Sequence, residues 1–288
     1  MKLRSIVTAT TLVLSAFSAQ SSAKEYSGTL EKISDTGQIA IGYRESSIPF
    51  SYLNSDQKPV GYTIDLCKRI VKDIEQKLGK PIDIRYVPVN GKTRIPLIVN
   101  GTIDLECGST TNNLTRQEQV EYLPTTFITG AKLLTKEGSQ IESVADLEGK
   151  KIGLPQGSTN EKIIKAEAKR LGIKLDILPV SDHSQGFLAL QTERIDAYSA
   201  DHILLTGLIA KSKSPGNYKI SDDFLSYDPY AIMLRRDDSA FELVGKASLA
   251  ELFRSGEIET IYNKWFEPLG VEISPLLETA FRIQALPE

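Results

Sequence analysis

The sequence predicts an α/β fold with two lobes, each an open, mainly parallel sheet flanked by helices. Strand-like and helix-like segments alternate along the chain, which is typical of parallel sheets. This alternation occurs twice, with similar endings. The 288 residues are 41% hydrophobic and 25% charged, with a mean hydropathy of −0.17. This composition fits about two globular domains and excludes a disordered, collagen-like or coiled-coil chain.

The first half begins with an apolar strand at 39–43. A helix is expected at 64–78, where apolar residues recur at helical spacing, and Gly79 ends it. The next expected elements are a strand at 82–87, a short helix at 94–100 and a strand at 103–107. Residues 24–37, before the first strand, are polar and aperiodic, so we expect a loose lead-in without regular structure.

The second half repeats this order. A short strand at 151–154 precedes a helix that starts at Ser158, where the S-x-x-E spacing to Glu161 is that of a capping box. Gly172 ends this helix. The following elements are expected to be a strand at 175–180, a helix at 184–193 and a strand at 195–199. Residues 239–265 are expected to form helices that pack back on the first lobe.

The two halves end in the same way. Ile103-Asp104 and Ile195-Asp196, 92 residues apart, each follow a helix and a short break and precede a strand with small polar residues after it. Two similar open sheets in one chain predict two lobes. Because open α/β sheets bind ligands at the carboxyl ends of their strands, two such edges that face each other would form a binding cleft.

Residues 1–23 have the layout of a secretory signal peptide, with Lys2 and Arg4, an apolar core at 6–17 and small residues at 21–23. The core is shorter than the ~20 residues that span a bilayer, and an uncleaved anchor is the alternative. Cleavage lowers the formal charge from −3 to −5. The rest of the chain has no apolar stretch of about 18 residues, so we expect a soluble protein outside the cytoplasm.

The two cysteines, Cys67 and Cys107, reach an oxidising compartment after export. A disulfide between them would close a loop of about 40 residues and add roughly 4 kcal/mol of stability. Two buried free thiols are the alternative. Two cysteines and two histidines are too few for a four-thiolate zinc site or a histidine metal centre. The net charge gives no electrostatic footprint for nucleic acid.

Sequence motifs of catalysis and cofactor binding are absent. G-x-S-x-G, H-E-x-x-H, the P-loop pattern and G-x-G-x-x-G do not occur. His183 and His202 have no carboxylates at metal-ligand spacing. These absences favour a protein that is not an enzyme and that uses no cofactor or metal.

Guanidinium and hydroxyl groups gather at the ends of the predicted strands. Arg44 follows the first strand, Arg94 opens a short helix, and the polar run 108–113 follows the third strand. In the second half, 156–159 leads into a helix N-terminus, whose free N–H groups suit a carboxylate. Arginine forms bidentate pairs with carboxylates. Asp201, after the last strand, suits an ammonium group.

The segments GYRESSIPFSY at 42–52 and ECGSTTNNLTR at 106–116, with the turn at 94–96, resemble the periplasmic glutamate/aspartate-binding proteins of ABC importers, within family 3 of the solute-binding proteins. The resemblance covers 39–265. It implies the type II periplasmic-binding-protein fold, whose two lobes close on the ligand. It also implies a periplasmic protein that delivers L-glutamate or L-aspartate to a permease in the inner membrane, and we expect a monomer.

The same fold implies lobe boundaries. Lobe 1 is expected to be discontinuous, at 38–129 plus 229–288, and lobe 2 comprises 130–228. Two crossing strands join the lobes in this family. The hinge is therefore expected near 129–130 and 227–228.

The resemblance assigns roles at the amino-acid end of the ligand. Arg116 matches the arginine that pairs with the α-carboxylate, and N–H and hydroxyl groups near Ser158 and Thr159 would assist it from the other lobe. The expected partners of the ammonium group are Ser109, Thr111 and Asp201. Each of these hydroxyl and carboxylate side chains also suits a helix cap, which is the alternative interpretation.

At the side-chain end, the resemblance implies Arg44, Arg94 and His183 as partners of the distal carboxylate. An exposed loop position is the alternative for His183. Gly91 stands where the resembled proteins have a serine, which removes one hydroxyl donor. Two aromatic residues, Phe50 and Tyr52, are either core residues or a wall along the aliphatic part of the ligand.

A charge count favours an acidic ligand, because three arginines and Asp201 give the site a formal charge of +2 with histidine neutral. A neutral amino acid would leave Arg44 and Arg94 unpaired, at roughly 1–3 kcal/mol per group. The main alternative is a periplasmic dehydratase-like enzyme on the same scaffold, acting on a dicarboxylic acid with Glu45 or His183 as the acid. A sensory ligand-binding domain is a second alternative.

Overall fold

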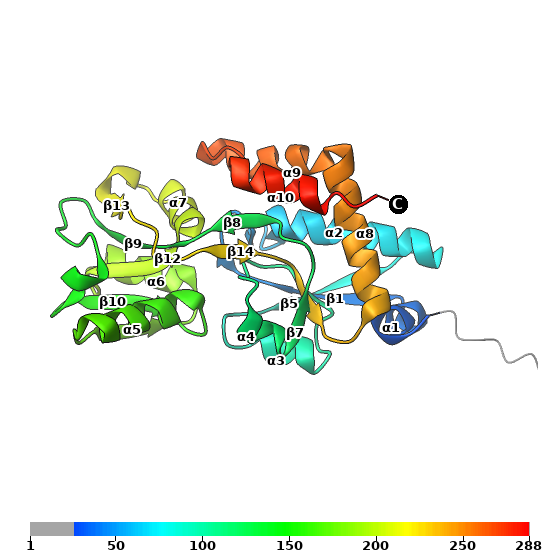
Figure 1. Cartoon of the computed structure of the whole chain (residues 1–288), viewed down its shortest axis with the longest axis horizontal. Coiled ribbons are helices and arrows are strands. Elements are labelled where there is room, and N and C mark those ends of the chain that lie inside the picture. Colours follow the sequence, from blue (N-terminus) through cyan, green and yellow to red (C-terminus); the bar gives the residue numbers. More distant parts are fainter. Residues whose placement is uncertain (1–25, 288) are drawn as a thin grey trace, which may run out of the picture.

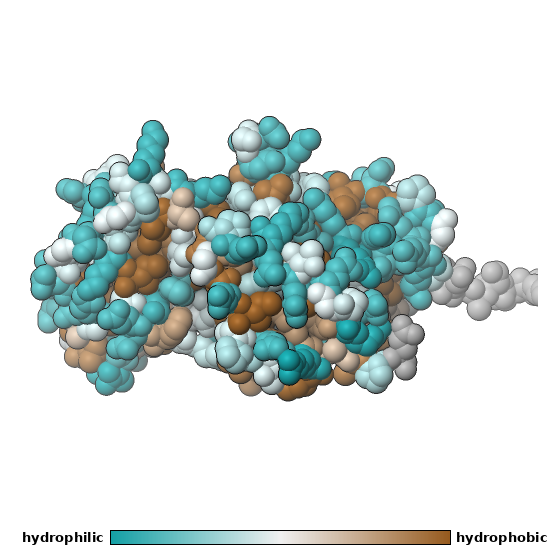
Figure 2. Space-filling model, turned by 90° about the horizontal axis from the view of Figure 1, so that it is seen from above, coloured by the Kyte–Doolittle hydropathy of each residue, from teal (hydrophilic) through white to brown (hydrophobic). Residues whose placement is uncertain are grey.

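The computed structural model describes residues 26–287, which form two lobes side by side joined by two strands (Figure 1). The predicted signal peptide at 1–23 lies outside the described residues. Within 26–287, no helix combines the length and the apolar character that crossing a membrane requires. The face in Figure 2 is mostly hydrophilic, and its apolar side chains lie in separate patches.

The first lobe is built on a five-stranded sheet with the strand order β5-β1-β6-β15-β7. β1 runs parallel to β5 and β6, whereas β15 is antiparallel to β6 and β7. The strands are β1 (Gln38–Tyr43), β5 (Asp83–Pro88), β6 (Leu105–Glu106), β7 (Val120–Tyr122) and β15 (Met233–Arg235). The strands predicted at 39–43 and 82–87 are confirmed, and the one predicted at 103–107 is shorter than expected.

The second lobe is built on a five-stranded sheet with the order β11-β10-β12-β9-β13. β10 runs parallel to β11 and β12, whereas β9 is antiparallel to β12 and β13. The strands are β9 (Ala131–Lys136), β10 (Lys151–Pro155), β11 (Asp176–Val180), β12 (Ala197–Asp201) and β13 (Tyr218–Ile220). The predicted strands at 151–154, 175–180 and 195–199 all occur, with ends shifted by one or two residues.

Two strands run between the lobes, β8 (Phe127–Thr129) and β14 (Asp228–Tyr230). They are antiparallel, with Asp228 opposite Thr129. The hinge segments expected near 129–130 and 227–228 fall at the ends of these strands. The hinge itself and the lobe boundaries remain predictions.

Helices surround both sheets, and the predicted C-terminal helices pack on the first lobe against α2. The helices of the first lobe are α1 (Gly28–Thr36), α2 (Tyr62–Leu78), α3 (Arg94–Val99), α4 (Leu114–Gln117), α8 (Ser239–Ser255), α9 (Glu257–Phe266), η3 (Glu267–Leu269) and α10 (Pro275–Gln284). The same lobe has a small sheet of β2 (Ser46–Ser47), β3 (Ser51–Leu53) and β4 (Pro59–Val60). The helices of the second lobe are η1 (Val144–Leu147), α5 (Thr159–Leu171), α6 (His183–Gln191), α7 (His202–Ala210) and η2 (Pro215–Asn217).

The loose lead-in predicted at 24–37 is wrong, because most of it forms α1. Leu30 and Ile33 are buried on the face of the helix that meets the lobe. The N-terminus of α1 is satisfied from far away in the sequence, since the Thr29 N–H donates to Asp238 Oδ2 at 2.9 Å. Such a tertiary cap leaves no local sequence signal. In the sequence, the Leu30–Ile33 spacing and the glycine at 37 were the signs of a helix, and Gly37 adopts the left-handed conformation that ends it.

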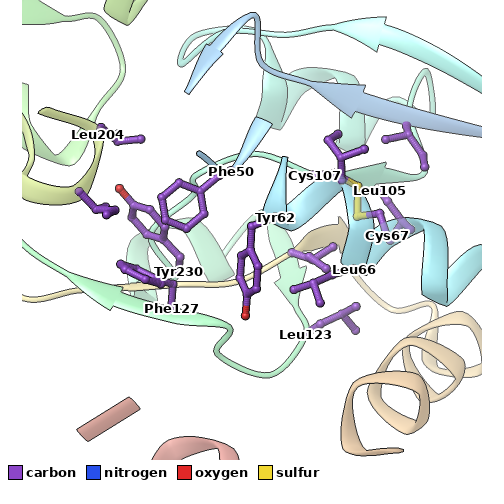
Figure 3. Packing of buried hydrophobic residues seen from close by; sticks show 14 of the residues in the cluster. Phe50, Tyr62, Leu66, Cys67, Leu105, Cys107, Leu123, Phe127, Leu204 and Tyr230 are labelled. Carbon is purple, nitrogen blue, oxygen red and sulfur yellow. A yellow bond between two sulfur atoms is a disulfide. The ribbon is translucent and has the colours of Figure 1, made fainter. Parts of the chain in front are cut away.

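Aromatic side chains fill the centre of the first lobe (Figure 3). The ring of Phe50 lies 5.0 Å from that of Phe127 and 5.1 Å from that of Tyr230, centroid to centroid. Phe50 is fully buried, so of the two predicted alternatives it is a core residue. Tyr52 is half-buried and its ring meets that of Trp265 edge to face.

Cys67 and Cys107 form the predicted disulfide, which rules out the free-thiol alternative (Figure 3). Their Cα atoms are 6.4 Å apart, across 40 positions of sequence. The bridge joins α2 to the residue that follows β6. It therefore ties the end of β6 to α2 within the core of the first lobe.

Candidate functional site

A cavity lies between the lobes at the carboxyl ends of the central strands, where the sequence predicted a cleft. Because β1, β6, β10 and β12 are parallel within their sheets, the residues that follow them reach two facing edges. Eight of the nine predicted binding residues line the cavity: Arg44, Arg94, Ser109, Thr111, Ser158, Thr159, His183 and Asp201. The other lining residues are Gly91, Pro155, Gln156, Asn160, Ser181 and Leu204.

Arg44 places an unpaired guanidinium group at this cavity. The residue is 5% exposed, and its side chain has no hydrogen bond or ion pair to any residue of the described chain. Its backbone N–H donates to Ser51 Oγ at 2.9 Å, which holds the turn after β1. Burial and the nearby Arg94 lower the pKa of Arg44 to about 10, and Glu106 opposes this shift. A buried cation without a partner is unfavourable, so this group suits an incoming anion.

Arg94 belongs to a buried network of hydrogen bonds on the first-lobe side of the cavity. Its Nη1 donates to Thr110 Oγ1 at 2.5 Å, and the Thr110 hydroxyl donates to Glu106 Oε2 at 2.6 Å. Arg94 Nε and Glu106 Oε1 are buried without a hydrogen-bond partner in the part of the chain that the structure describes. Glu106 and Thr110 are not among the nine predicted binding residues, because a strand residue and the middle of the polar run 108–113 carry no separate signal.

Two further buried carboxylates change the charge of the site. Glu106 is fully buried and Asp228 is 1% exposed, and both act on the pKa of Arg116. Together with Asp201 they balance the three arginines, so the predicted charge of +2 is wrong. The count omitted carboxylates that only folding brings near the site. The pairing of each arginine, and not the total charge, therefore has to decide which ligand is preferred.

Arg116 lies beside the cavity and does not line it. It sits in α4, where Asn113 Oδ1 accepts from the Arg116 N–H at 3.0 Å and caps the helix. Its Nη1 donates to the Thr111 carbonyl at 2.8 Å, and its Nη2 donates to the Gly157 carbonyl of the other lobe at 3.3 Å. Burial and Arg94 lower its pKa to about 10. Arg116 thus connects the two edges of the cleft.

A helix cap was the alternative interpretation for the predicted hydroxyl residues, and among them only Ser158 caps a helix. Ser158 caps α5, because its Oγ accepts from the Glu161 N–H at 3.0 Å and its hydroxyl donates to Pro155 at 2.6 Å. Ser109 is no cap, since its Oγ is buried without a partner among the described residues. Thr111 is no cap either. Its hydroxyl donates to Asp228 Oδ1 at 2.8 Å, and its Oγ1 lies 3.5 Å from that of Thr159 across the cleft.

Asp201 ends β12 and precedes α7, but its side chain does not cap that helix. Its Oδ1 accepts from Asn160 Nδ2 at 2.9 Å, and its Oδ2 accepts from the Tyr230 hydroxyl. Burial and Asp228 raise the pKa of Asp201 to about 6, although the two hydrogen bonds oppose the shift. Asn160 is not among the predicted binding residues; the Ser199 hydroxyl donates to its Oδ1 at 3.2 Å and holds it in place.

His183 is buried at the start of α6 and is not the exposed loop residue of the alternative interpretation. Its Nδ1 lies 2.8 Å from the Tyr198 hydroxyl. Burial, with Arg44 and Arg94 nearby, lowers the pKa of His183 well below its ordinary value of 6.5. The imidazole is therefore neutral at physiological pH and acts as a hydrogen-bonding group. In the described residues, no group of three or more His, Cys, Asp or Glu is placed to hold a metal.

Two lobes, a polar cavity between them and crossing strands define a class of ligand-binding proteins, and comparison with known sequences places the chain in it. Residues 39–268 match the model of the bacterial extracellular solute-binding proteins, family 3, and the chain belongs to this family. The "L-glutamate/L-aspartate-binding protein" of Pseudomonas aeruginosa is 37% identical over all of this chain and 97% of its own length. The "Glutamate/aspartate import solute-binding protein" of Escherichia coli is 40% identical over 93% of this chain and 90% of its own.

Solved structures agree on the fold. An ancestral arginine-binding protein bound to glutamine superposes with a TM-score of 0.72 at 30% identity, over 80% of this chain and 98% of that one. The solute receptor for L-cysteine of Neisseria gonorrhoeae has a TM-score of 0.76 at 20% identity, over 86% and 98% of the two chains. The predicted two-lobed periplasmic-binding-protein fold is therefore confirmed.

Proposed function

We propose that this protein is the substrate-binding component of an ABC importer for acidic amino acids, L-glutamate or L-aspartate. The observation that carries the proposal is the unpaired guanidinium group of Arg44, together with Arg94 Nε, at a cavity between the lobes. A carboxylate supplies two charged acceptor oxygens to these groups, whereas an amide supplies one neutral acceptor beside an NH2 donor, and an aliphatic side chain supplies none. Relatives named for glutamate and aspartate support the same ligand.

The cleft divides into two ends in this proposal. Arg116 pairs with the α-carboxylate, assisted by the N-terminus of α5 at Ser158 and Thr159. The expected ammonium partners are Ser109, Thr111 and Asp201. Arg44 and Arg94 take the distal carboxylate, with neutral His183 as a further hydrogen-bonding group. The unpartnered Ser109 Oγ supports its role as an acceptor for the ammonium group.

Binding needs no covalent step in this proposal. The ligand enters the open cleft, contacts from both lobes favour the closed form, and the closed form docks on a permease in the inner membrane. The protein acts as a monomer in the periplasm, without enzymatic activity. The names of the relatives favour this function over the dehydratase alternative.

Calorimetric titration tests the proposal. The mature protein is stripped of bound ligand by unfolding and refolding and is then titrated with glutamate, aspartate, glutamine, arginine and succinate. We expect micromolar or tighter binding of glutamate or aspartate, about −8 kcal/mol or more favourable, and much weaker binding of the rest. Tighter binding of glutamine or arginine would contradict the proposal. Heat from succinate alone would reopen the dehydratase alternative, which product formation on long incubation would then test.

The variant Arg44→Met isolates the carboxylate contact. We expect a loss of roughly ten- to hundredfold in affinity for glutamate and aspartate and little change for glutamine, because a charged hydrogen bond contributes about 1.5–3 kcal/mol. Arg194→Met is the matched control, since Arg194 is an exposed arginine of the second lobe. Equal losses for acidic and neutral ligands would remove Arg44 from the distal-carboxylate role.

A further inference from the structure

Two loops from opposite lobes meet at glycines beside the cavity. Gly91 lies between β5 and α3, and Gly157 lies between β10 and α5. A β-carbon on Gly91 would lie 2.2 Å from the carbonyl oxygen of Gln156, and one on Gly157 would lie 2.6 Å from the carbonyl oxygen of Gly91. Both distances are shorter than a β-carbon can tolerate, and both neighbours are backbone atoms. Only glycine at both positions allows the two loops to come this close.

The backbone of Gly91 does not itself require glycine. Its φ lies outside the left-handed region, whereas Gly157 has a φ of 71° and needs glycine for its own conformation. Residue 91 could therefore carry a side chain as far as the first lobe is concerned. The constraint on this position comes from the second lobe, and it exists only while the cleft is closed to the spacing seen in the structure.

Neither loop has slack to absorb an added carbon atom. In the first lobe, Asn90 Oδ1 accepts from the N–H groups of Lys92 and Thr93 at 2.9 and 3.1 Å. In the second lobe, the Gln156 N–H donates to the Val180 carbonyl at 3.0 Å. The Gly157 N–H donates to Glu161 Oε2 at 2.9 Å. Because both turns are tied to their own lobes, a side chain at 91 has to be accommodated by the lobes moving apart.

We propose that Gly91 sets the closed spacing of the two lobes, and that any side chain at this position weakens ligand binding by holding the cleft open. The inference rests on the proposed function, since it takes closure around the ligand as the binding event. Moving the Gln156 oxygen from 2.2 Å to the ordinary contact distance of 3.4 Å needs 1.2 Å of separation. That movement breaks the hydrogen bond from Arg116 Nη2 to Gly157, which is already 3.3 Å long.

The glycine at 91 then has two possible effects on binding. The first is the loss of a hydroxyl donor, since a serine is expected here from the resemblance. The second is the close approach of the Gly91 and Gln156 loops, which a serine side chain at 91 would prevent at this spacing. Substitution by alanine and by serine separates the two interpretations, since both add a β-carbon and only serine restores the hydroxyl.

The experiment compares Gly91→Ala and Gly91→Ser with the wild type by calorimetry and stopped-flow kinetics, using glutamate and aspartate. We expect both variants to lose roughly tenfold or more in affinity, mainly through faster dissociation. Gly216→Ala is the matched control, because Gly216 has an ordinary φ and no atom within 4 Å of an added β-carbon. Wild-type affinity in Gly91→Ala, or a gain confined to Gly91→Ser, would overturn the inference.

A second measurement separates this inference from the proposed function. Nitroxide labels on Lys72→Cys and Lys169→Cys, exposed positions of the two lobes, report the distance between the lobes with and without ligand. If the wild type binds a different amino acid, the proposed function fails and the labels are read with that ligand. We expect the Gly91 variants to lack the shortest distances that the wild type reaches. Identical distance distributions in wild type and variants would contradict the inference.

Discussion

In the first lobe β1 runs parallel between β5 and β6, and in the second lobe β10 runs parallel between β11 and β12. In each sheet an antiparallel strand then follows on the far side, β15 in one and β9 in the other. The Ile-Asp pairs noted in the sequence occupy matching places, because Leu105 pairs with Ile41 and Ala197 pairs with Ile152. The two lobes thus share one plan of sheet construction.

The lobes differ in what they present to the cleft. The first lobe contributes three arginines and the buried Glu106, while the second contributes Asp201, neutral His183 and the N-terminus of α5. A shared scaffold therefore carries unlike chemistry on its two edges. Strand order therefore determines where a side chain lies along the cleft, whereas the identity of the residues after each strand determines which ligand groups can bind.

The largest effect expected concerns the disulfide, which only the first lobe has in the described chain. Replacing Cys67 and Cys107 by alanine should lower the free energy of unfolding by about 4 kcal/mol, because the unfolded chain regains the entropy of a 40-residue loop. Chemical denaturation of the oxidised protein and of the double variant measures this difference. Ligand affinity should stay within about twofold under native conditions. A large loss of affinity with unchanged stability would show that the bridge positions the site instead.

The next effect concerns the arginine that reaches across the cleft. Arg116→Ala should lower the affinity for every α-amino acid by about a hundredfold or more, because a buried charged hydrogen bond to the α-carboxylate is lost. Calorimetry with glutamate, aspartate and glutamine gives the three losses. Undiminished binding of any of them would remove Arg116 from its assigned role.

A smaller effect distinguishes the two Ile-Asp pairs. Asp104 is buried, accepts from the Ala40 N–H at 2.8 Å and pairs with Lys32 of α1 at 2.7 Å. Asp196 is exposed and accepts from the Lys151 N–H at 2.7 Å. Asp104→Ala should therefore destabilise the protein by about 2 kcal/mol and Asp196→Ala by about 1 kcal/mol or less. Equal losses in thermal unfolding would mean that burial of the first pair adds nothing.

The smallest effect expected is a pH dependence carried by the second lobe. Because the pKa of Asp201 is raised to about 6, the ligand-free fold favours its neutral form, whereas a ligand ammonium group needs the carboxylate. Affinity for glutamate should therefore fall about tenfold between about pH 7 and about pH 5. The ligand-free protein should show the opposite trend. Because the pKa of Asp201 is higher in the folded protein than in the unfolded chain, Asp201 should make the ligand-free protein more stable at about pH 5 than at about pH 7.

Asp201→Asn should remove both trends. Burial and the neighbouring Arg44 and Arg94 lower the pKa of His183, and the Asp201→Asn variant separates its titration from that of Asp201. Calorimetry at the two pH values checks the affinities, and thermal unfolding checks the stabilities. Parallel pH profiles in Asp201→Asn and the wild type would assign the titration to another group.

Local patterns in the sequence predicted the α/β class and most strands and helices, because strand alternation and helix ends are local signals. Polar runs after the strands pointed to most of the nine candidate binding residues, while His183 and the role of each residue came from the family resemblance. Only the tertiary structure revealed α1, whose N-terminus is satisfied by Asp238, and the buried carboxylates Glu106 and Asp228, which overturn the charge count. It also brought Gly91 against Gln156. The cap on α1 and the contact of Gly91 with Gln156 depend on partners from distant segments, and the burial of Glu106 and Asp228 depends on how the segments pack, so local sequence patterns indicate them weakly or not at all.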